Sequence, residues 1–184
     1  MNNLIIITGD LAAGKSTLAA SLSEELRIPF VTKDALKEIA CDAIGYANRE
    51  ENRHLSIAAT GSMIYFFEQM AKVNQDMILE ANFREDEIAR IKQIADENAY
   101  RVALIVLTGD TNLLYQRFLD RLSNRHIAHR SLNLDYSLER FAEYIDEIRN
   151  QNLLFSPHYI DMTELDEEDV TSQALAIINI ELGL

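Results

Sequence analysis

Residues 9–16 constrain this chain more than any other feature of its sequence. The segment reads Gly-Asp-Leu-Ala-Ala-Gly-Lys-Ser and matches the pattern G-x-x-x-x-G-K-[ST] at every fixed position. An apolar, β-branched run at residues 4–8 precedes it, which is typical of a strand buried on both faces of a parallel sheet. Leucines recur at every fourth position within residues 15–27, which is helical spacing. The sequence therefore predicts a strand, a glycine loop and a helix in succession.

The backbone of such a loop suits a polyphosphate. Glycines let the chain wrap closely, its N–H groups point inward, and the N-terminus of the following helix adds positive potential. We expect Lys15 to pair with the β- and γ-phosphates of ATP and act in catalysis, and Ser16 to ligate Mg²⁺. A glycine-rich turn with a lysine by coincidence is the alternative. The residues expected to hold the nucleotide are Gly9, Asp10, Leu11, Ala12, Ala13, Gly14, Lys15, Ser16 and Thr17.

The rest of the chain continues the alternation of strands and helices. Apolar runs predict further strands at residues 29–32, 77–80, 101–107 and 157–161. A long helix is expected at about 54–73 after a polar loop at 45–53, and Asp34 is expected to cap the helix after the second strand. This alternation predicts a doubly wound, mostly parallel α/β sheet.

Length and composition favour one globular domain over residues 1–184. The net charge of −13 repels nucleic acid and anionic membranes. The lone Cys41 can form neither an internal disulfide nor a zinc motif, which favours a reducing cytoplasm. The apolar run at residues 4–8 is too short for a signal peptide or a membrane span. We expect a cytoplasmic protein that is a monomer or a weak homodimer.

Polar side chains follow the ends of several predicted strands. Because ligands bind beyond the carboxyl ends of parallel strands, these side chains are expected to share a rim with residues 9–16. Asp34 can accept a proton from an acceptor hydroxyl or hold that hydroxyl, alongside its role as a cap. Glu80 ends its strand as a Walker B acid does and can hold a magnesium-bound water or orient substrate, although an ordinary strand-end carboxylate fits as well. Asn82 and Arg84 are expected to bind the acceptor.

Three arginines spaced by four, Arg117, Arg121 and Arg125, are predicted to share one helix face. Such a cluster is stable beside an anion, and a mobile lid that brings arginines to the transferring phosphoryl group is one arrangement of this kind. We therefore expect Arg121 and Arg125 to act in catalysis, and Arg117 and Arg121 to contact the nucleotide. Pairing with nearby acidic residues on a solvated helix is the alternative.

The motifs that define this site are residues 9–17, Asp34, residues 78–83, the Arg117 and Arg121 pair, and residues 125–129. Together they resemble the P-loop kinases of small molecules related to zeta toxins, chloramphenicol phosphotransferase and gluconate kinase. The resemblance implies a P-loop NTPase fold with three α/β/α layers, a five-stranded parallel sheet in the order 2-3-1-4-5 and a helical lid at about residues 122–132. It also implies ATP as the phosphoryl donor and an acceptor hydroxyl near Asp34.

The leading interpretation is an ATP- and Mg²⁺-dependent kinase that phosphorylates a hydroxyl of a small molecule. A regulatory nucleotide-binding ATPase, in which Glu80 or Asp34 positions water, is the alternative. No Asn-Lys-x-Asp motif follows the fourth predicted strand, so GTP is not favoured as the nucleotide. A polynucleotide kinase would need a basic track, which the net charge of −13 disfavours.

Overall fold

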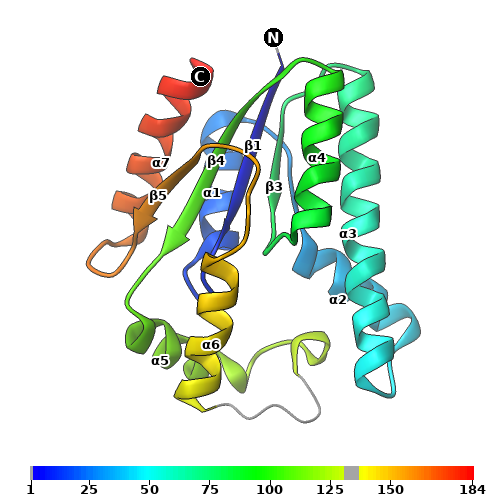
Figure 1. Ribbon diagram of the computed structural model, residues 1–184, viewed down its shortest axis with the longest axis vertical. Helices are drawn as coiled ribbons and strands as arrows, with labels where there is room; N and C mark the ends of the chain where they lie inside the picture. The colour runs from blue at the N-terminus through cyan, green and yellow to red at the C-terminus, as the bar shows by residue number, and fades with distance from the viewer. Residues whose placement is uncertain (1, 131–136) are drawn as a thin grey trace.

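The computed structural model describes residues 2–130 and 137–184 and consists of three layers (Figure 1). A five-stranded parallel sheet forms the middle layer, in the order β2-β3-β1-β4-β5. Its strands are β1 (Asn2–Gly9), β2 (Phe30–Thr32), β3 (Met77–Glu80), β4 (Tyr100–Thr108) and β5 (Pro157–Asp161). The predicted α/β/α fold of P-loop NTPases and the predicted strand order are confirmed.

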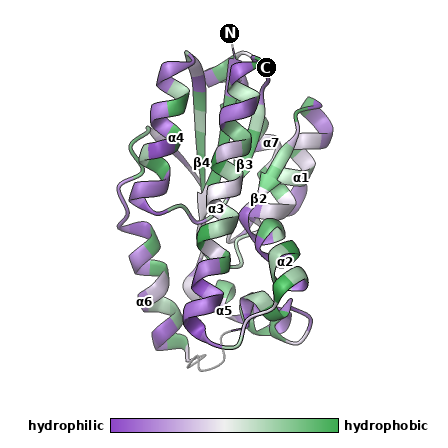
Figure 2. Cartoon of the chain, turned by 90° about the vertical axis from the view of Figure 1, so that its right-hand side faces the viewer, coloured by the Kyte–Doolittle hydropathy of each residue, from purple (hydrophilic) through white to green (hydrophobic). Residues whose placement is uncertain are grey.

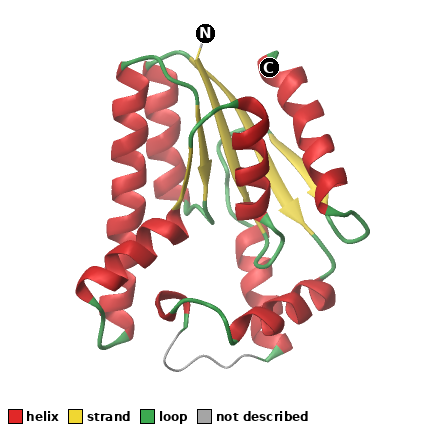
Figure 3. Cartoon of the chain, turned by 180° about the vertical axis from the view of Figure 1, so that it is seen from behind, coloured by secondary structure: helices red, strands yellow, loops and turns green. Residues whose placement is uncertain are grey.

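Helices cover both faces of the sheet. In chain order they are α1 (Lys15–Leu26), α2 (Lys33–Ile44), α3 (Arg49–Lys72), α4 (Glu85–Glu97), α5 (Thr111–Leu122), the short 3₁₀ helix η1 (Ile127–His129), α6 (Leu138–Arg149) and α7 (Glu167–Leu182). Side chains of α1 and α7 pack on one face of the sheet, and those of α3 and α4 pack on the other (Figures 1 and 3). Within these two described ranges, no helix is long and apolar enough to cross a membrane.

Strand β1 occupies the centre of the sheet, which explains its continuous apolar run. Ile5 and Ile7 belong to the core shared with α1 and α7, whereas Leu4 and Ile6 belong to the core shared with α3 and α4. All four side chains are fully buried. Burying one such side chain contributes roughly 1.5–3 kcal/mol, so both alternating sets of positions must be apolar.

The helices are amphipathic because only one side of each faces the sheet. Figure 2 shows hydrophilic and hydrophobic residues alternating along α4 and α6. In α4 the buried positions Ile88, Ile91 and Ile94 recur at helical intervals, and the charged Arg90 and Lys92 lie between them. This periodicity is the signal from which the sequence predicted the helical layers.

Helix α2 begins with a different cap from the one expected. The Thr32 hydroxyl accepts a hydrogen bond from the Ala35 N–H (3.2 Å), and Asp34 lies in the first turn. The prediction that Asp34 caps this helix is therefore wrong. The Asp34 carboxylate can therefore act on a ligand without giving up a capping hydrogen bond at the start of α2.

Helix α3 begins at Arg49, well before the predicted start. Asn48 accepts a hydrogen bond from the Glu51 N–H (2.9 Å), and the Glu51 carboxylate accepts one from the Ala47 N–H (2.6 Å). The polar loop predicted at 45–53 is wrong from residue 49 onward. This reciprocal capping stabilises a first turn whose side chains are mostly exposed, so hydrophobic periodicity could not reveal it.

The arginine cluster is also arranged differently from the prediction. Arg117 and Arg121 lie on α5, but this helix ends at Leu122 and Arg125 follows it in a turn. The three arginines therefore do not share one helix face. Arg125 is positioned by the segment that leads into η1.

The carboxyl ends of the strands point toward a second group of helices. Figure 1 shows α5, η1, α6 and the first half of α3 below the arrowheads of the sheet. The glycine loop after β1 and the ends of β2 and β3 meet these helices at the same edge. Any ligand of the loop at residues 9–16 would therefore lie between the sheet and this group of helices.

Candidate active site

The loop between β1 and α1 has the tight backbone that its glycines allow. Gly9 has a φ of 123°, and a Cβ atom there would lie 2.1 Å from the Leu107 carbonyl oxygen. Gly14 has a φ of 85° and precedes the first residue of α1. Both positions require glycine, because side chains strain these conformations and a clash arises at Gly9. The Asp10 N–H donates to the Leu107 carbonyl (2.8 Å), which ties the loop to β4.

Lys15 begins α1 and folds back over the loop. Its Nζ donates to the main-chain carbonyls of Gly9 (3.1 Å) and Asp10 (2.6 Å). Burial lowers the pKa of Lys15, and the nearby Glu80 carboxylate opposes this shift. The two carbonyl groups compensate only part of the cost of desolvating the ammonium, and a negatively charged ligand would compensate more of it. The buried ammonium therefore attracts an anionic ligand strongly.

The Asp10 side chain is fully buried and forms a clamp with Arg149. Arg149 Nη2 lies 2.6 Å from Asp10 Oδ2, and Arg149 Nε lies 3.1 Å from Oδ1. Arg149 also donates to the Gly109 carbonyl (2.8 Å), and the Gly109 N–H donates to Asp10 (3.2 Å). The hydrogen bond that Arg149 donates to Asp10 is the main cause that raises the pKa of Arg149. The clamp joins the loop, the end of β4 and the end of α6.

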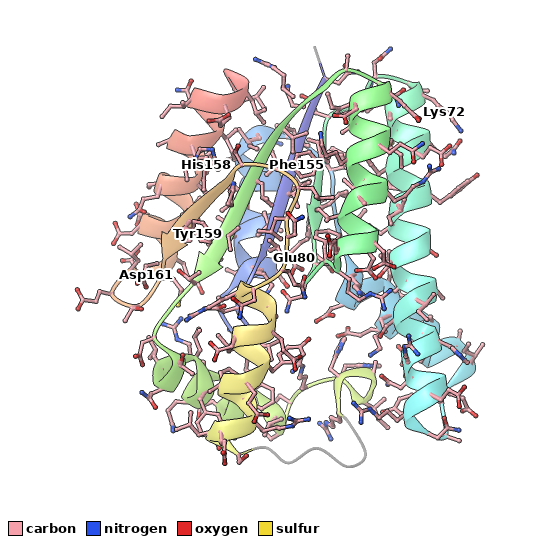
Figure 4. All side chains as sticks on the ribbon, in the orientation of Figure 1. Lys72, Glu80, Phe155, His158, Tyr159 and Asp161 are labelled. Atoms are coloured by element: carbon pink, nitrogen blue, oxygen red, sulfur yellow. The ribbon has the colours of Figure 1, made fainter. Side chains whose placement is uncertain are left out.

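Ser16 and Glu80 form the oxygen pair expected at a magnesium site. The Ser16 hydroxyl donates to Glu80 Oε2 (3.0 Å), and Glu80 is buried at the carboxyl end of β3 (Figure 4). Burial raises the pKa of Glu80, while the charge of Lys15 and the Ser16 hydrogen bond lower it. Mg²⁺ prefers oxygen ligands and usually combines one or two protein groups with phosphate oxygens and waters. The donor set therefore fits this ion beside a nucleotide.

A cavity of about 1000 Å³ extends from the glycine loop to α2. It brings together most of the residues that the sequence nominated. Its lining includes residues 11–17 of the loop, together with Asp34, Glu80, Asn82, Arg121 and Arg125. Segments far apart in the chain thus converge on one concave surface, with the phosphate loop at one end and Asp34 across from it.

Asp34 faces two basic side chains across this cavity. Its carboxylate oxygens lie 3.9 Å from Arg125 Nη2 and 3.8 Å from His129 Nδ1. The other ring nitrogen of His129 lies 2.9 Å from Glu38 Oε1. Burial lowers the pKa of His129, against the opposing charge of Asp34. Asp34 is 56% exposed, so it remains accessible to a ligand in the cavity.

A second cavity of about 340 Å³ adjoins the first on the other side of the loop. Ala13, Gly14, Thr17 and Arg121 line both cavities, and Arg117 contributes to this one. Its remaining walls come from α1, α7 and the loop after β5 and combine apolar side chains (Leu18, Met162, Leu165, Val170) with polar ones (Asp166, Glu167, Thr171). A group attached to a phosphate chain in the loop can extend into this cavity, because the two cavities share lining residues.

The observed site differs from the predicted one at two residues. Arg84 is not among the residues that line either cavity; its guanidinium is 47% exposed and pairs with Asp86 (3.5 Å) and Glu87 (3.3 Å). Lys37 was not predicted, yet it is buried and lines the large cavity. Helical spacing alone could have indicated it, because Lys37 lies one turn after Asp34 and shares its face of α2.

The segment predicted as a lid packs against α2 and α3. Residues 122–130 of this segment are described, and residues 131 and 132 lie outside the described ranges. The Tyr46 hydroxyl donates to the Ile127 carbonyl (2.6 Å), and Asn52 Nδ2 donates to the Ala128 carbonyl (2.9 Å). His126 Nε2 lies 3.0 Å from Asp42 Oδ1. These contacts hold His126, Ala128 and His129 in the wall of the large cavity.

The architecture and this loop define a nucleotide-binding class, and sequence comparison gives the family. The chain belongs to the AAA domain family, whose profile matches residues 5–136. A comparison with curated protein sequences gives no match.

Solved structures with the same fold include several kinases of small molecules. A proposed kinase from Chloroflexus aurantiacus J-10-fl is 25% identical, with a TM-score of 0.79 over 95% of this chain and 97% of that one. A gluconokinase from Sinorhizobium meliloti 1021 is 15% identical, with a TM-score of 0.61 over 99% and 94% of the two chains. A shikimate kinase from Bacteroides thetaiotaomicron is 16% identical, with a TM-score of 0.62 over 99% of each chain. The finer resemblance to zeta toxins and chloramphenicol phosphotransferase stays a prediction.

Proposed function

We propose that this protein is an ATP- and Mg²⁺-dependent phosphotransferase that phosphorylates a hydroxyl of a small molecule. One observation carries the proposal: Lys15 and Ser16 share a single cavity of about 1000 Å³ with the Asp34 carboxylate. A donor held by the loop and an acceptor held at Asp34 would thus face each other inside one enclosure. The similarity to small-molecule kinases supports a kinase-like role.

The phosphate side of the site binds the donor. The N–H groups of residues 11–17 and the ammonium of Lys15 hold the phosphates of ATP. Ser16, with Glu80 acting directly or through water, holds Mg²⁺, which neutralises charge on the phosphates. Arg121 and Arg125 line the same cavity and stabilise the charge that develops on the transferred group.

The second cavity holds the adenosine end of ATP. It shares Gly14 and Arg121 with the large cavity, so one nucleotide can extend from one cavity to the other. Leu18 and Val170 offer apolar surface to the base, and Arg117 offers a planar cation.

The acceptor side of the site centres on Asp34. Its carboxylate takes the proton of the acceptor hydroxyl, or holds that hydroxyl in line with the phosphate. Arg125 and His129, within 4 Å of the carboxylate, hold its orientation. Glu80 and Asn82 line the cavity between the loop and Asp34 and contact the acceptor or the metal-bound waters.

The lid and the cellular setting belong to the same proposal. The chain acts as a single kinase domain in which the segment at about 122–132 closes over the bound substrates and excludes water. The small-molecule acceptor is the partner of this site. The cytoplasmic location and the monomer or weak homodimer stay predictions.

Release of ADP in the presence of ATP, Mg²⁺ and a panel of hydroxylated metabolites tests the proposal. We expect release to depend on one class of acceptor and to be lost in the Lys15→Ala variant. Steady ADP release that no acceptor stimulates would instead support the regulatory ATPase. Exposed Lys72, far from the cavity, provides the control variant Lys72→Ala, which should match the wild type.

A further inference from the structure

Lys37 is a buried cation on the acceptor side of the large cavity. It is 8% exposed, it lines the cavity, and its Nζ donates to the Asn52 side-chain carbonyl (2.8 Å). The amide of Asn52 is itself fixed, because its Nδ2 donates to the Ala128 carbonyl (2.9 Å). A rigid neutral group thus holds the ammonium at the wall of the cavity.

The neighbouring basic side chains on this side have carboxylate partners. Arg125 faces Asp34 (3.9 Å), Lys33 faces Glu87 (3.3 Å), and His129 contacts Glu38 (2.9 Å). Lys37, by contrast, has no carboxylate within ion-pair distance in the described part of the chain. Buried charges are normally paired, because an unpaired one is costly to desolvate.

The electrostatic environment of Lys37 agrees with its lack of a carboxylate partner. Burial is the main cause that lowers the pKa of Lys37, and the charges of Lys33 and Arg125 lower it further against the opposing charge of Asp34. A bound anion would supply the missing counter-charge and stabilise the charged ammonium. The side chain therefore has the burial, position and charge of a group that binds a ligand.

We propose that Lys37 binds a carboxylate of the acceptor, so that the substrates of this enzyme are small hydroxy acids. This inference rests on the phosphotransferase function proposed above. A single uncompensated cation matches a monoanionic carboxylate, whereas a dianionic phosphate would leave excess negative charge beside Asp34 and Glu38. The hydroxyl of Ser56 also lines the cavity, and by turning from the Asn52 main-chain carbonyl (3.4 Å) it can donate a second hydrogen bond to the carboxylate.

The helix sets the distance between the two ends of the acceptor. Asp34 and Lys37 are three residues apart on α2, so their Cα atoms are separated by about 4.5 Å along the axis. An acceptor whose hydroxyl lies at Asp34 would place its carboxylate about one helical turn away. Compact hydroxy acids satisfy this spacing, and neutral polyols of the same size leave Lys37 unpaired.

A panel of aliphatic and alicyclic hydroxy acids, each compared with its own primary amide and with a phosphate monoester of similar size, tests the inference. For the wild type we expect kcat/KM for the preferred acid to exceed that for its amide by on the order of 100-fold. In Lys37→Gln the preference should fall to about threefold or less, chiefly through KM for the acid, with KM for ATP unchanged. Lys72→Gln, at an exposed lysine, should retain the wild-type preference.

The outcomes separate this inference from the proposed function. Turnover of amides or phosphate monoesters as fast as acids, or a preference that survives Lys37→Gln, would overturn the carboxylate site and leave the kinase standing. Thermal stabilisation by the acids that requires Lys37, without any release of ADP, would keep the carboxylate site and contradict the kinase. Acids that neither stabilise the protein nor are turned over would overturn the inference. Lys37→Met, which fills the same buried volume without a charge, replaces Lys37→Gln if that variant does not fold.

Discussion

The two ends of the large cavity are built by different means. At the phosphate end, Lys15 contacts Gly9 and Asp10, which are 6 and 5 residues away along the chain. At the acceptor end, His129 contacts Glu38 across 91 residues. The phosphate end is mostly backbone geometry encoded by one short motif, whereas the acceptor end consists of side chains that only the tertiary fold brings together.

This difference has a functional consequence. A backbone cradle offers the same N–H groups to any polyphosphate, so it suits a donor that related enzymes share. Side chains from α2, α3 and the η1 segment can change one at a time without disturbing that cradle. We therefore expect variants at the phosphate end to abolish activity broadly and variants at the acceptor end to change which substrates are used.

The largest effect is expected for Lys15→Ala at the phosphate end. Loss of the ammonium removes charge stabilisation from the β- and γ-phosphates, so kcat should fall roughly 1000-fold for every acceptor. Steady-state kinetics of ADP release would measure it, with circular dichroism to confirm folding. A loss restricted to some acceptors would break the contrast between the two ends.

At the acceptor end, Asp34→Asn should lower kcat by roughly 100-fold or more. Affinity for ATP, measured by calorimetry, should stay within about twofold, because the carboxylate lies across the cavity from the loop. Thr32→Ala is the matched control: it removes the cap of α2 and should cost about 1 kcal/mol of stability, with a far smaller loss of turnover. Equal losses in both variants would mean that Asp34 acts through the helix rather than on the acceptor.

The clamp between Asp10 and Arg149 should affect stability and ATP affinity together. Arg149→Met leaves the fully buried Asp10 without its ion pair, so we expect a loss of about 2 kcal/mol and roughly tenfold weaker binding of ATP. Chemical denaturation and calorimetry would measure these changes. Asp10→Asn combined with Arg149→Met should recover part of the stability, since no buried charge then remains unpaired. A stable Arg149→Met variant with normal ATP affinity would show that the loop holds its shape unaided.

The smallest effect concerns pH and His129. Because the pKa of His129 is lowered below its ordinary value of 6.5 in the folded protein, the unfolded chain binds more protons near that value. Burial of His129 therefore costs little stability above about pH 6.5, where the side chain is neutral in both states, and the free energy of unfolding decreases as the pH falls below that value. Thermal denaturation across this range should show a weaker pH dependence in His129→Gln than in the wild type. An unchanged profile would assign the dependence to other groups.

The sequence predicted the parts of this molecule that depend on local patterns. The motif at residues 9–16, the apolar β-branched run of β1 and the amphipathic spacing of α4 led to the correct fold class. The correct strand order came from the resemblance to P-loop kinases of small molecules. The start of α3 was missed, because its first turn is stabilised by polar capping at Asn48 and carries little hydrophobic periodicity. Local pattern thus located the elements better than it located their ends.

The acceptor end and the clamp could be predicted only in part. Asp34, Glu80 and Asn82 were nominated because they follow strands, and the structure gathers them in one cavity. Arg149 was missed because it lies 139 residues from Asp10, and a contact over that distance leaves no local signature. Arg84 was nominated by the same strand-end rule, yet it turns toward the acidic first turn of α4 and away from the cavity.

Transfer of labelled phosphate tests most directly the claim that one cavity joins donor and acceptor. The wild type should move label from γ-labelled ATP onto a hydroxyl of a small acceptor, and Asp34→Asn should lose this transfer while still binding ATP. Label that appears only as inorganic phosphate, whatever acceptor is supplied, would contradict the account.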